Sequence, residues 1–322
     1  MSAGRTPLLA YRAPTSRNRL VMARNCHGQD LDVSMDRNAP PAKLNALTVD
    51  VEDYYHVSAF ERYVSRRQWD TYPSRVVPNT RRLLELFARR EVRATFFVLG
   101  WVGHRFPSLV KEIAAAGHEV GCHSYWHRLI YDQTPSAFAN DLKQARDVLQ
   151  DALGIPVTAY RAPSWSITER SRWALTILAE EGFTHDSSIF PIYHDRYGVP
   201  NGNPFPHALE MGTRRLWEFP PSVVRVAGVN VPVSGGGYFR LYPATWTACG
   251  LRRVNRRAHQ PFLFYIHPWE LDPDQPRVAA TWRARWRHSL NLASTEAKLD
   301  WLLSQFRFGC LTEVIKQLAE RQ

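Results

Sequence analysis

The residues best suited to chemistry in this sequence are two histidines and a run of carboxylates. His123 and His127 belong to the segment His-Ser-Tyr-Trp-His, so they would share one face if that segment were helical. Asp50, Glu52 and Asp53 form the run Asp-Val-Glu-Asp directly after an apolar segment. Two imidazoles and one carboxylate can hold a divalent metal and leave a coordination position for water. Another carboxylate would then be free to act as a general base.

Each of these signals has an ordinary explanation when it is taken alone. A His-x-x-x-His pair without a metal is the more frequent case, and an acidic run is commonly an exposed turn. The combination is more informative, because carboxylates at the end of a strand are costly unless they are solvated, paired or bound to a metal. The same ligand set also suits Fe(II), so a non-haem iron oxygenase is an alternative.

Two further segments end in residues that suit such a site. Tyr-Arg-Ala-Pro at 160–163 follows an expected strand, and its Arg161 could clamp a carboxylate. The β-like run Phe-Tyr-Ile-His at 264–267 ends in His267, which taken alone is better explained as a structural histidine. Trp165, Tyr238 and Trp269 are candidates for stacking on sugar rings, although each is equally compatible with a place in the core.

Apolar periodicity predicts the elements that must position these residues. The expected strands are 44–49, 94–99, 119–122 and 157–160. The expected helices are 79–90, 107–116, 136–153 and 169–181. This alternation with short connections predicts an α/β domain with a parallel sheet, in which functional residues lie at the carboxyl ends of the strands. Beyond residue 190 the alternation stops, and the later predictions are a β-like run at 222–233 and a helix at 295–306.

Composition excludes several classes of protein. With 322 residues, 44% of them hydrophobic, the chain can bury a core, so wholesale disorder is excluded. Its apolar stretches are too short to span a bilayer, and no two of its four cysteines have C-x-x-C spacing. The first residues lack the apolar core of a signal peptide, which predicts a cytoplasmic protein, peripheral at the inner membrane if it is membrane-associated.

The order of these motifs resembles the NodB-homology polysaccharide deacetylases, carbohydrate esterase family 4. An Asp-containing block after the first strand is followed by His-Ser-x-x-His, Arg-x-Pro, an Asp near an aromatic residue, and x-x-His. In this sequence they read Thr48 to Asp53, His123 to His127, Arg161 to Pro163, Asp186 to Phe190, and Ile266-His267. The resemblance extends over about 44–270.

A closer resemblance is to the exopolysaccharide deacetylases of the XrtA/PEP-CTERM locus. It is carried by 50–57, Ser-Gly-Gly-Gly-Tyr-Phe-Arg at 234–240, His-Pro-Trp-Glu at 267–270 and the C-terminal extension. The resemblance implies a deformed (β/α) barrel. We expect the chain to consist of a mobile basic tail (1–43), a deacetylase domain (44–275) and a helical extension packed on that domain (276–322).

The resemblance also implies a role for each site residue. His123, His127 and Asp53, with Glu52 as the alternate to Asp53, would hold a divalent metal, most simply Zn2+. Asp50 would be the general base and Arg161 would hold its carboxylate. His267 would be the general acid, oriented by Asp186.

The implied reaction is the metal-dependent hydrolysis of N-acetyl groups on N-acetylhexosamine units of a bacterial exopolysaccharide or its lipid-linked precursor. The alternatives are a peptidoglycan or chitooligosaccharide deacetylase and, in another class, a non-catalytic glycan-binding protein. The chain has a net charge of +11, and its residues 282–288 form a basic-aromatic patch, in which basic and aromatic side chains are interleaved. We expect this patch to contact an anionic glycan or lipid carrier, and we expect no nucleic-acid partner.

Overall fold

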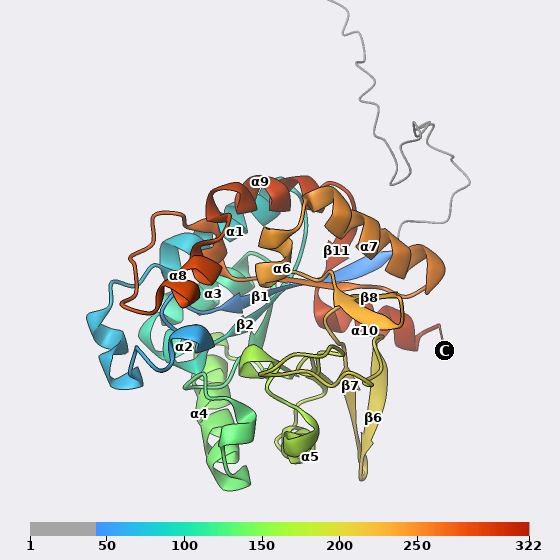
Figure 1. Cartoon of the computed structure of the whole chain (residues 1–322). Helices are drawn as coiled ribbons and strands as arrows, with labels where there is room; N and C mark the ends of the chain where they lie inside the picture. Colours follow the sequence, from blue (N-terminus) through green and yellow to red (C-terminus); the bar gives the residue numbers. More distant parts are fainter. Residues whose placement is uncertain (1–42, 322) are drawn as a thin grey trace, which may run out of the picture. The chain divides into compact units, whose positions relative to one another are not determined.

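The largely apolar run after Lys43 forms β1 (Leu44–Val51), an interior strand of a mixed sheet (Figure 1). The computed structural model describes residues 43–321. All residues of β1 after Leu44 are buried, which explains why apolar residues stand on both faces of the strand, although Asn45, Thr48 and Asp50 are polar. On one side β1 pairs with β10 (Leu263–Ile266), and on the other with β2 (Thr95–Val98) and, at its start, with β11 (Arg307–Gly309).

The sheet continues from β2 in the order expected for alternating strands and helices. Its further strands are β3 (Glu119–Cys122), β4 (Ala159–Tyr160), β5 (His185–Asp186), β7 (Arg214–Glu218) and β6 (His207–Met211). All neighbours in the sheet are parallel except β6 and β7. The carboxyl ends of β1 to β5, β7 and β10 therefore lie at one edge.

An irregular segment lies between the two ends of the parallel sheet. It contains the hairpin β8 (Val223–Val226) and β9 (Val229–Pro232). The Ser222 hydroxyl accepts a hydrogen bond from the Leu263 backbone N–H, and the Ser234 carbonyl accepts one from that of Tyr265. The segment thus contacts β10, and the mixed sheet is consistent with the deformed (β/α) barrel that the family resemblance implies.

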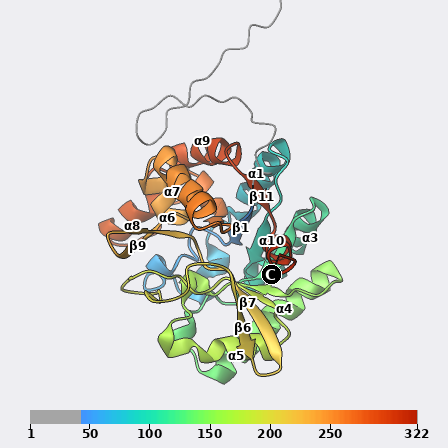
Figure 2. The ribbon, with the colours of Figure 1, turned by 90° about the vertical axis from the view of Figure 1, so that its right-hand side faces the viewer.

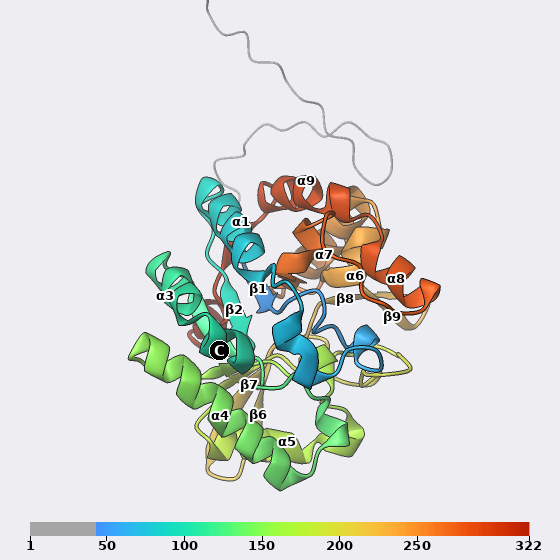
Figure 3. The ribbon, with the colours of Figure 1, turned by 90° about the vertical axis from the view of Figure 1, so that its left-hand side faces the viewer.

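The helices surround this sheet. They are α1 (Val76–Arg89), α2 (Gly100–Arg105), α3 (Pro107–Ala115), α4 (Pro135–Leu153), α5 (Trp173–Glu180), α6 (Gly236–Leu241), α7 (Ala244–Arg257), α8 (Trp282–Ser289), α9 (Leu292–Leu303) and α10 (Leu311–Ala319). Short 3-10 helices are η1 (Ser58–Phe60), η2 (Arg66–Thr71), η3 (Ile130–Asp132), η4 (Pro163–Trp165), η5 (Glu169–Ser171) and η6 (Pro268–Leu271). Figures 2 and 3 show α6 to α9 gathered on one side of the molecule, away from α4 and α5. No helix within 43–321 is long and apolar enough to cross a membrane.

Local sequence signals account for the boundaries of α4. The Thr134 hydroxyl accepts a hydrogen bond from the Ala137 N–H, and Pro135 occupies the first turn, where its missing N–H costs nothing. At the other end Gly154 adopts a left-handed φ of 71°. The predicted end of this helix at Gly154 is therefore confirmed.

The later half of the chain departs from the sequence prediction. The β-like run at 222–233 is a hairpin, because Ala227 and Gly228 both have positive φ and reverse the chain. The helix expected at 295–306 begins at Leu292 and ends at Leu303. Helix α7 was not predicted, although its buried face follows helical spacing through Thr247, Ala248, Leu251 and Val254.

The described residues, 43–321, belong to one compact unit. Helix α9 packs on α6, α7 and η6, so the C-terminal segment is built into the same core as the strand that ends in Ile266. The expected division at residue 275 stays a prediction. The expected tail at 1–43 lies, apart from Lys43, outside the described residues.

Candidate metal and catalytic site

Three buried side chains gather where β1 and β3 end. Glu52 directly follows β1, His123 directly follows β3, and the loop after His123 returns His127 to the same place. One ligand atom from each of the three lies within 4.8 Å of the other two. The two histidines are thus brought together, as the sequence predicts.

The loop that carries the histidines is not helical, so the premise of a shared helical face is wrong. Ser124 and His127 have positive φ angles of 60° and 51°, and these turn the chain back on itself. The buried carboxylate of Asp141 on α4 accepts hydrogen bonds from the N–H groups of Tyr125 (2.7 Å) and Trp126 (3.2 Å). Asp141 therefore holds the loop in shape.

Asp53 lies elsewhere, and its selection as the metal-binding carboxylate is wrong. Its carboxylate accepts hydrogen bonds from the Ser74 hydroxyl (2.6 Å) and from the N–H groups of Arg75 (2.9 Å) and Val76 (3.1 Å). These donors stand at the start of α1, where backbone N–H groups have no partner within the helix. Asp53 stabilises that helix start, and Glu52, the alternate, takes the place beside the histidines.

The ionisation of Glu52 and of His123 fits metal ligands. Burial alone would raise the pKa of Glu52, but the charges of His127, His267 and His123 outweigh it and lower the pKa. Burial lowers the pKa of His123 to about 4, which favours the neutral imidazole. The Nδ1 atom of His123 is hydrogen-bonded to the Arg161 carbonyl (2.8 Å), so Nε2 remains to bind a metal.

A close contact within this set is also consistent with a cation. Oε2 of Glu52 lies 2.7 Å from Nε2 of His127, within ion-pair distance, and both side chains are buried. The same two atoms are suited to binding one positive ion between them. A carboxylate with two imidazoles fits a divalent metal such as zinc.

Asp50 and Arg161 form a buried ion pair next to this set. Nη1 of Arg161 donates to Oδ1 of Asp50 (2.6 Å) and to the Thr48 hydroxyl (2.9 Å). Its other nitrogens donate to the carbonyl and the hydroxyl of Ser187, and the guanidinium lies 4.3 Å from the Phe97 ring centroid. The arginine is fully buried, so its charge is compensated mainly by Asp50. This is the contact that the sequence predicts for Arg161.

His267 lies across the site from Arg161, but Asp186 does not contact it. Nε2 of His267 is 3.8 Å from Oδ2 of Asp50 and 3.7 Å from Oε1 of Glu52. Nδ1 is hydrogen-bonded to Glu270 (2.7 Å), and the other oxygen of Glu270 accepts from Nε of Arg240 (2.7 Å). The residue that orients His267 is therefore Glu270.

The charge on Glu270 also affects His267. Burial by itself would lower the pKa of His267. The hydrogen bond and charge of Glu270, with the charges of Glu52 and Asp50, outweigh burial and raise the pKa to about 9. The pKa of Glu270 itself is lowered, because Arg240 and His267 overcome the opposite effect of burial. The two residues form a buried, oppositely charged pair.

Asp186 is instead paired with another carboxyl group. Its side chain accepts from the Ser188 hydroxyl (2.5 Å) and is hydrogen-bonded to Glu218 at the end of β7. Burial raises the pKa of Asp186 to about 6, and burial together with the charge of Asp186 raises that of Glu218 well above its ordinary value. A proton shared by the two groups removes most of the charge from this part of the core.

The three aromatic candidates do not line an open sugar site together. Trp165 is 6% exposed and packs edge-on against Tyr265. Trp269 is 4% exposed, stacks on His267 and His288, and donates from Nε1 to Glu52. Both rings are almost fully buried, so neither offers an exposed surface for stacking, and their contact with sugars stays a prediction. The sugar contact of half-buried Tyr238 stays a prediction.

Sequence reasoning missed Asp141, Arg240 and Glu270. Signals for two of them exist in the segments 234–240 and 267–270, where a conspicuous polar residue ends each segment. Only the packing of α6 against η6 reveals that Arg240 and Glu270 form a pair, 30 positions apart. Asp141 has no sequence signal, because its partners are backbone groups.

Comparison with known proteins agrees with this geometry. Residues 67–182 match the family described as Polysaccharide deacetylase, and residues 187–316 match a Domain of unknown function, DUF3473. The first match includes His123, His127 and Arg161, while His267 and Glu270 fall in the second. The acidic run at 50–53 precedes both matches.

The chain is similar to two curated relatives over little more than a third of its length. It is 34% identical over 119 residues to YheN of Bacillus subtilis, which is named as a polysaccharide deacetylase (36% of this chain, 41% of that one). It is 34% identical over 121 residues to the peptidoglycan deacetylase of Helicobacter pylori (36% and 40%). The matched region thus spans about two fifths of the length of each relative.

The fold is similar to a crystal structure from Mycobacterium smegmatis that is described as a polysaccharide deacetylase. The two structures superpose with a TM-score of 0.57 at 18% identity, covering 88% of this chain and 92% of the other. At this identity the likeness concerns the fold alone. Two consecutive parts of the chain thus match family models, 67–182 the Polysaccharide deacetylase family and 187–316 the DUF3473 family, each over less than half of the chain.

Proposed function

We propose that this protein is a metal-dependent N-deacetylase that acts on N-acetylhexosamine units of a bacterial exopolysaccharide or its lipid-linked precursor. The proposal is carried by the position of His267. Its Nε2 lies within 4 Å of both Asp50 and the ligand Glu52, at 3.8 and 3.7 Å. A proton donor, a proton acceptor and a ligand set for a divalent ion therefore surround one point.

The residues of this chain supply the proton transfers. Asp50 would accept the proton of the water that attacks the acetamide carbonyl, and Arg161 would orient the Asp50 carboxylate through their ion pair. His267 would donate a proton to the departing amine nitrogen, which is otherwise a poor leaving group. Glu270 would fix the ring of His267 and stabilise its charged form. The products are acetate and a hexosamine unit of the glycan with a free amine, and the enzyme forms no covalent bond to the substrate.

Glu52, His123 and His127 would hold the metal, with zinc as the expected ion. When bound, a divalent ion polarises a carbonyl group and lowers the pKa of a water molecule. The hydrogen bond from His123 to the Arg161 carbonyl and the hold of Asp141 on the loop would fix the two imidazoles in place.

The choice of an exopolysaccharide rests on the sequence resemblance to the XrtA/PEP-CTERM subgroup. Peptidoglycan and chitooligosaccharides are the alternative substrates, and a non-catalytic glycan-binding protein is the alternative in another class. We also propose a cytoplasmic location, with the basic-aromatic patch at 282–288 as the contact for an anionic glycan or lipid carrier at the inner membrane.

Acetate release by the metal-loaded full chain tests this proposal. The substrates are N-acetylglucosamine oligomers, peptidoglycan fragments and an N-acetylated exopolysaccharide. We expect release from the exopolysaccharide to be fastest and to disappear in His127→Ala and Asp50→Asn. A protein that binds no divalent metal, or one that binds the glycan without releasing acetate, would contradict the proposal.

A further inference from the structure

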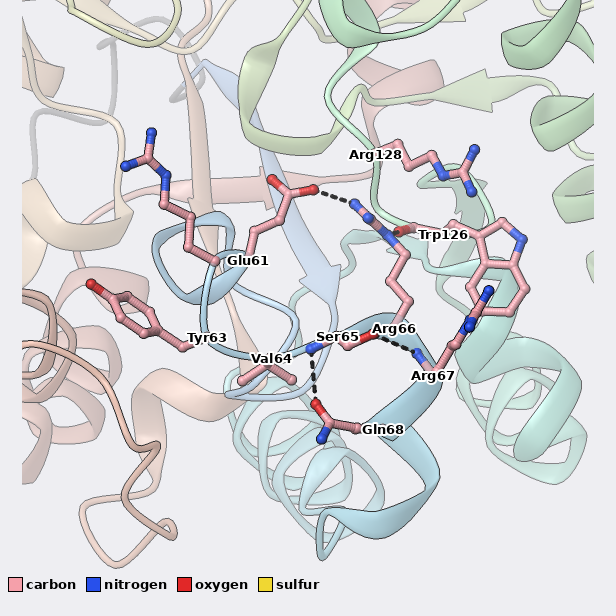
Figure 4. Close-up of a pocket in the computed structure, with 10 residues that line it drawn as sticks. Glu61, Tyr63, Val64, Ser65, Arg66, Arg67, Gln68, Trp126 and Arg128 are labelled. Carbon is pink, nitrogen blue, oxygen red and sulfur yellow. Dashed lines mark hydrogen bonds and ion pairs between the residues drawn. The ribbon is translucent and has the colours of Figure 1, made fainter.

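A pocket of about 740 Å³ opens beside the candidate metal site (Figure 4). Its volume is within the range of roughly 300–1,000 Å³ that is usual for small-molecule sites. The segment 61–68, which leads into η2, forms one wall, and the loop after β3 forms the other. The lining residues are Glu61, Arg62, Tyr63, Val64, Ser65, Arg66, Arg67, Gln68, Trp126 and Arg128.

The pocket shares its wall with the metal site. Nε of Arg66 donates to the Trp126 carbonyl (2.6 Å), and Nη2 of Arg66 donates to that of His127 (3.4 Å). Trp126 and Arg128 line the pocket and directly precede and follow His127 in the chain. A group bound in the pocket therefore lies next to a residue of the candidate metal site. A sugar adjoining the reacting unit could therefore reach the pocket.

The charges that line the pocket are unbalanced. Four arginines face one carboxylate, Glu61, and that carboxylate is already paired with Arg66 (2.5 Å). The side chains of Arg62, Arg67 and Arg128 are exposed and have no ion-pair partner among residues 43–321. Unpaired cations around a concave surface concentrate a positive potential and attract anions.

The types of side chain indicate which anion would bind. A guanidinium offers parallel N–H donors that match the two oxygens of a carboxylate or of a phosphate. Figure 4 shows Arg67, Trp126 and Arg128 on the same side of the pocket. The half-buried Trp126 adds an apolar surface of the kind on which a sugar ring packs.

We propose that this pocket binds an anionic group of the glycan that is being deacetylated, so that the substrate is an acidic N-acetylated polysaccharide. This inference rests on the proposed function and specifies its substrate class. The anion is either the carboxylate of a sugar acid or a phosphate attached to the sugar. Both share the two-oxygen geometry that arginine recognises.

Calorimetric binding to the metal-loaded full chain tests the inference. The probes are a tetrasaccharide of alternating N-acetylglucosamine and glucuronic acid, the neutral N-acetylglucosamine tetramer, and N-acetylglucosamine 1-phosphate. The double variant Arg67→Gln, Arg128→Gln removes two unpaired charges from the pocket. The double variant Arg253→Gln, Arg256→Gln removes two exposed charges from α7 and serves as the matched control.

We expect an anionic probe to bind at least about tenfold more tightly than the neutral tetramer at low salt, since charge-assisted contacts add to its affinity. In the pocket variant this preference should disappear, and in the control variant it should remain. If the affinity for the uronic acid probe depends on Arg67 and Arg128, the bound anion is a sugar carboxylate. If the affinity for the phosphate probe depends on them, the bound anion is a phosphate.

Equal binding of the neutral and anionic probes, or no binding of either anionic probe, would overturn the inference. The same holds if the preference survives in the pocket variant but is lost in Arg283→Gln, Arg285→Gln, because the anion would then bind to α8. Binding is measured apart from acetate release. A protein that binds anions through Arg67 and Arg128 but hydrolyses no acetamide would refute the proposed reaction and leave anion binding by the pocket intact.

Discussion

Glu270 accepts a hydrogen bond of 2.7 Å from Nδ1 of His267, three positions earlier in the chain. Both residues lie at the turn into η6, where Oε1 of Glu270 also accepts from the N–H of His267. Arg240 from α6 neutralises the other oxygen of Glu270 at 2.7 Å. The orientation of the candidate acid thus depends on a helix of the C-terminal half of the chain.

Glu270→Gln should lower kcat for acetate release by about 10- to 100-fold and change KM little, because the neutral amide no longer stabilises a charged His267. Asp186→Asn should leave kcat within about twofold, since Asp186 does not contact His267. Steady-state kinetics of both variants, with thermal unfolding as a check on folding, measures this. The opposite ranking would restore Asp186 as the orienting residue.

Glu52→Ala should lower metal affinity by at least about 100-fold, because it removes one of three ligands. Asp53→Asn should leave the affinity unchanged but lower the melting temperature, because it weakens the hydrogen bonds at the start of α1. Chelator competition gives the affinity and calorimetry gives the melting temperature. Loss of metal from Asp53→Asn with normal binding by Glu52→Ala would contradict the assignment.

Asp50→Asn should reduce acetate release by about 1,000-fold while metal binding is retained, because the amide cannot accept the proton of water. Arg161 would then be a buried guanidinium without its counter-charge, so we also expect a lower melting temperature. Rate and metal content measured on one preparation separate the two effects. Substantial activity in this variant would exclude Asp50 as the base.

Asp141→Ala should weaken metal binding by roughly tenfold, although Asp141 contacts no metal ligand directly. The change frees the N–H groups of Tyr125 and Trp126 and loosens the loop between the two histidines. Asp147→Ala, at an exposed position of the same helix, is the matched control. Equal metal affinities in the two variants would show that the loop keeps its shape without Asp141.

The carboxyl pair of Asp186 and Glu218 should destabilise the protein as the pH rises. The folded-state pKa of Asp186 is raised to about 6 from its ordinary 3.8, and that of Glu218 is raised further above its own. A raised carboxyl pKa gives stability that is present at low pH and is lost as the pH rises through the folded value, here from about pH 4 through 6 and above.

Glu218→Gln removes one of these ionisations, so its melting temperature relative to the parent should increase by a few degrees between pH 5 and pH 8. Thermal unfolding across this range measures the difference. The exposed substitution Glu210→Gln on β6 is the control and should give a flat difference. A flat difference for Glu218→Gln as well would mean that the pair does not share a proton.

The early part of the chain was predictable because its signals are local. A largely apolar run marks β1, capping residues mark α4, and several site residues stand at strand ends, as with His123 after β3 and Arg161 after β4. Chain order in an alternating α/β sequence brings these strand ends to one edge, so Asp50, His123, His127 and Arg161 could be grouped from the sequence alone.

Only the tertiary structure determines which groups each carboxylate contacts. Glu52 and Asp53 are adjacent and chemically similar. The start of α1 packs beside Asp53 and supplies backbone N–H donors to its carboxylate, whereas the carboxylate of Glu52 lies beside the two histidines. Likewise Asp186 and Glu270 are both acidic residues near the end of a strand. Pairing with Glu218 neutralises the first and pairing with Arg240 keeps the second charged, and both partners come from distant parts of the chain. Sequence determines the set of chemical groups at the sheet edge, whereas long-range packing determines their ionisation and direction.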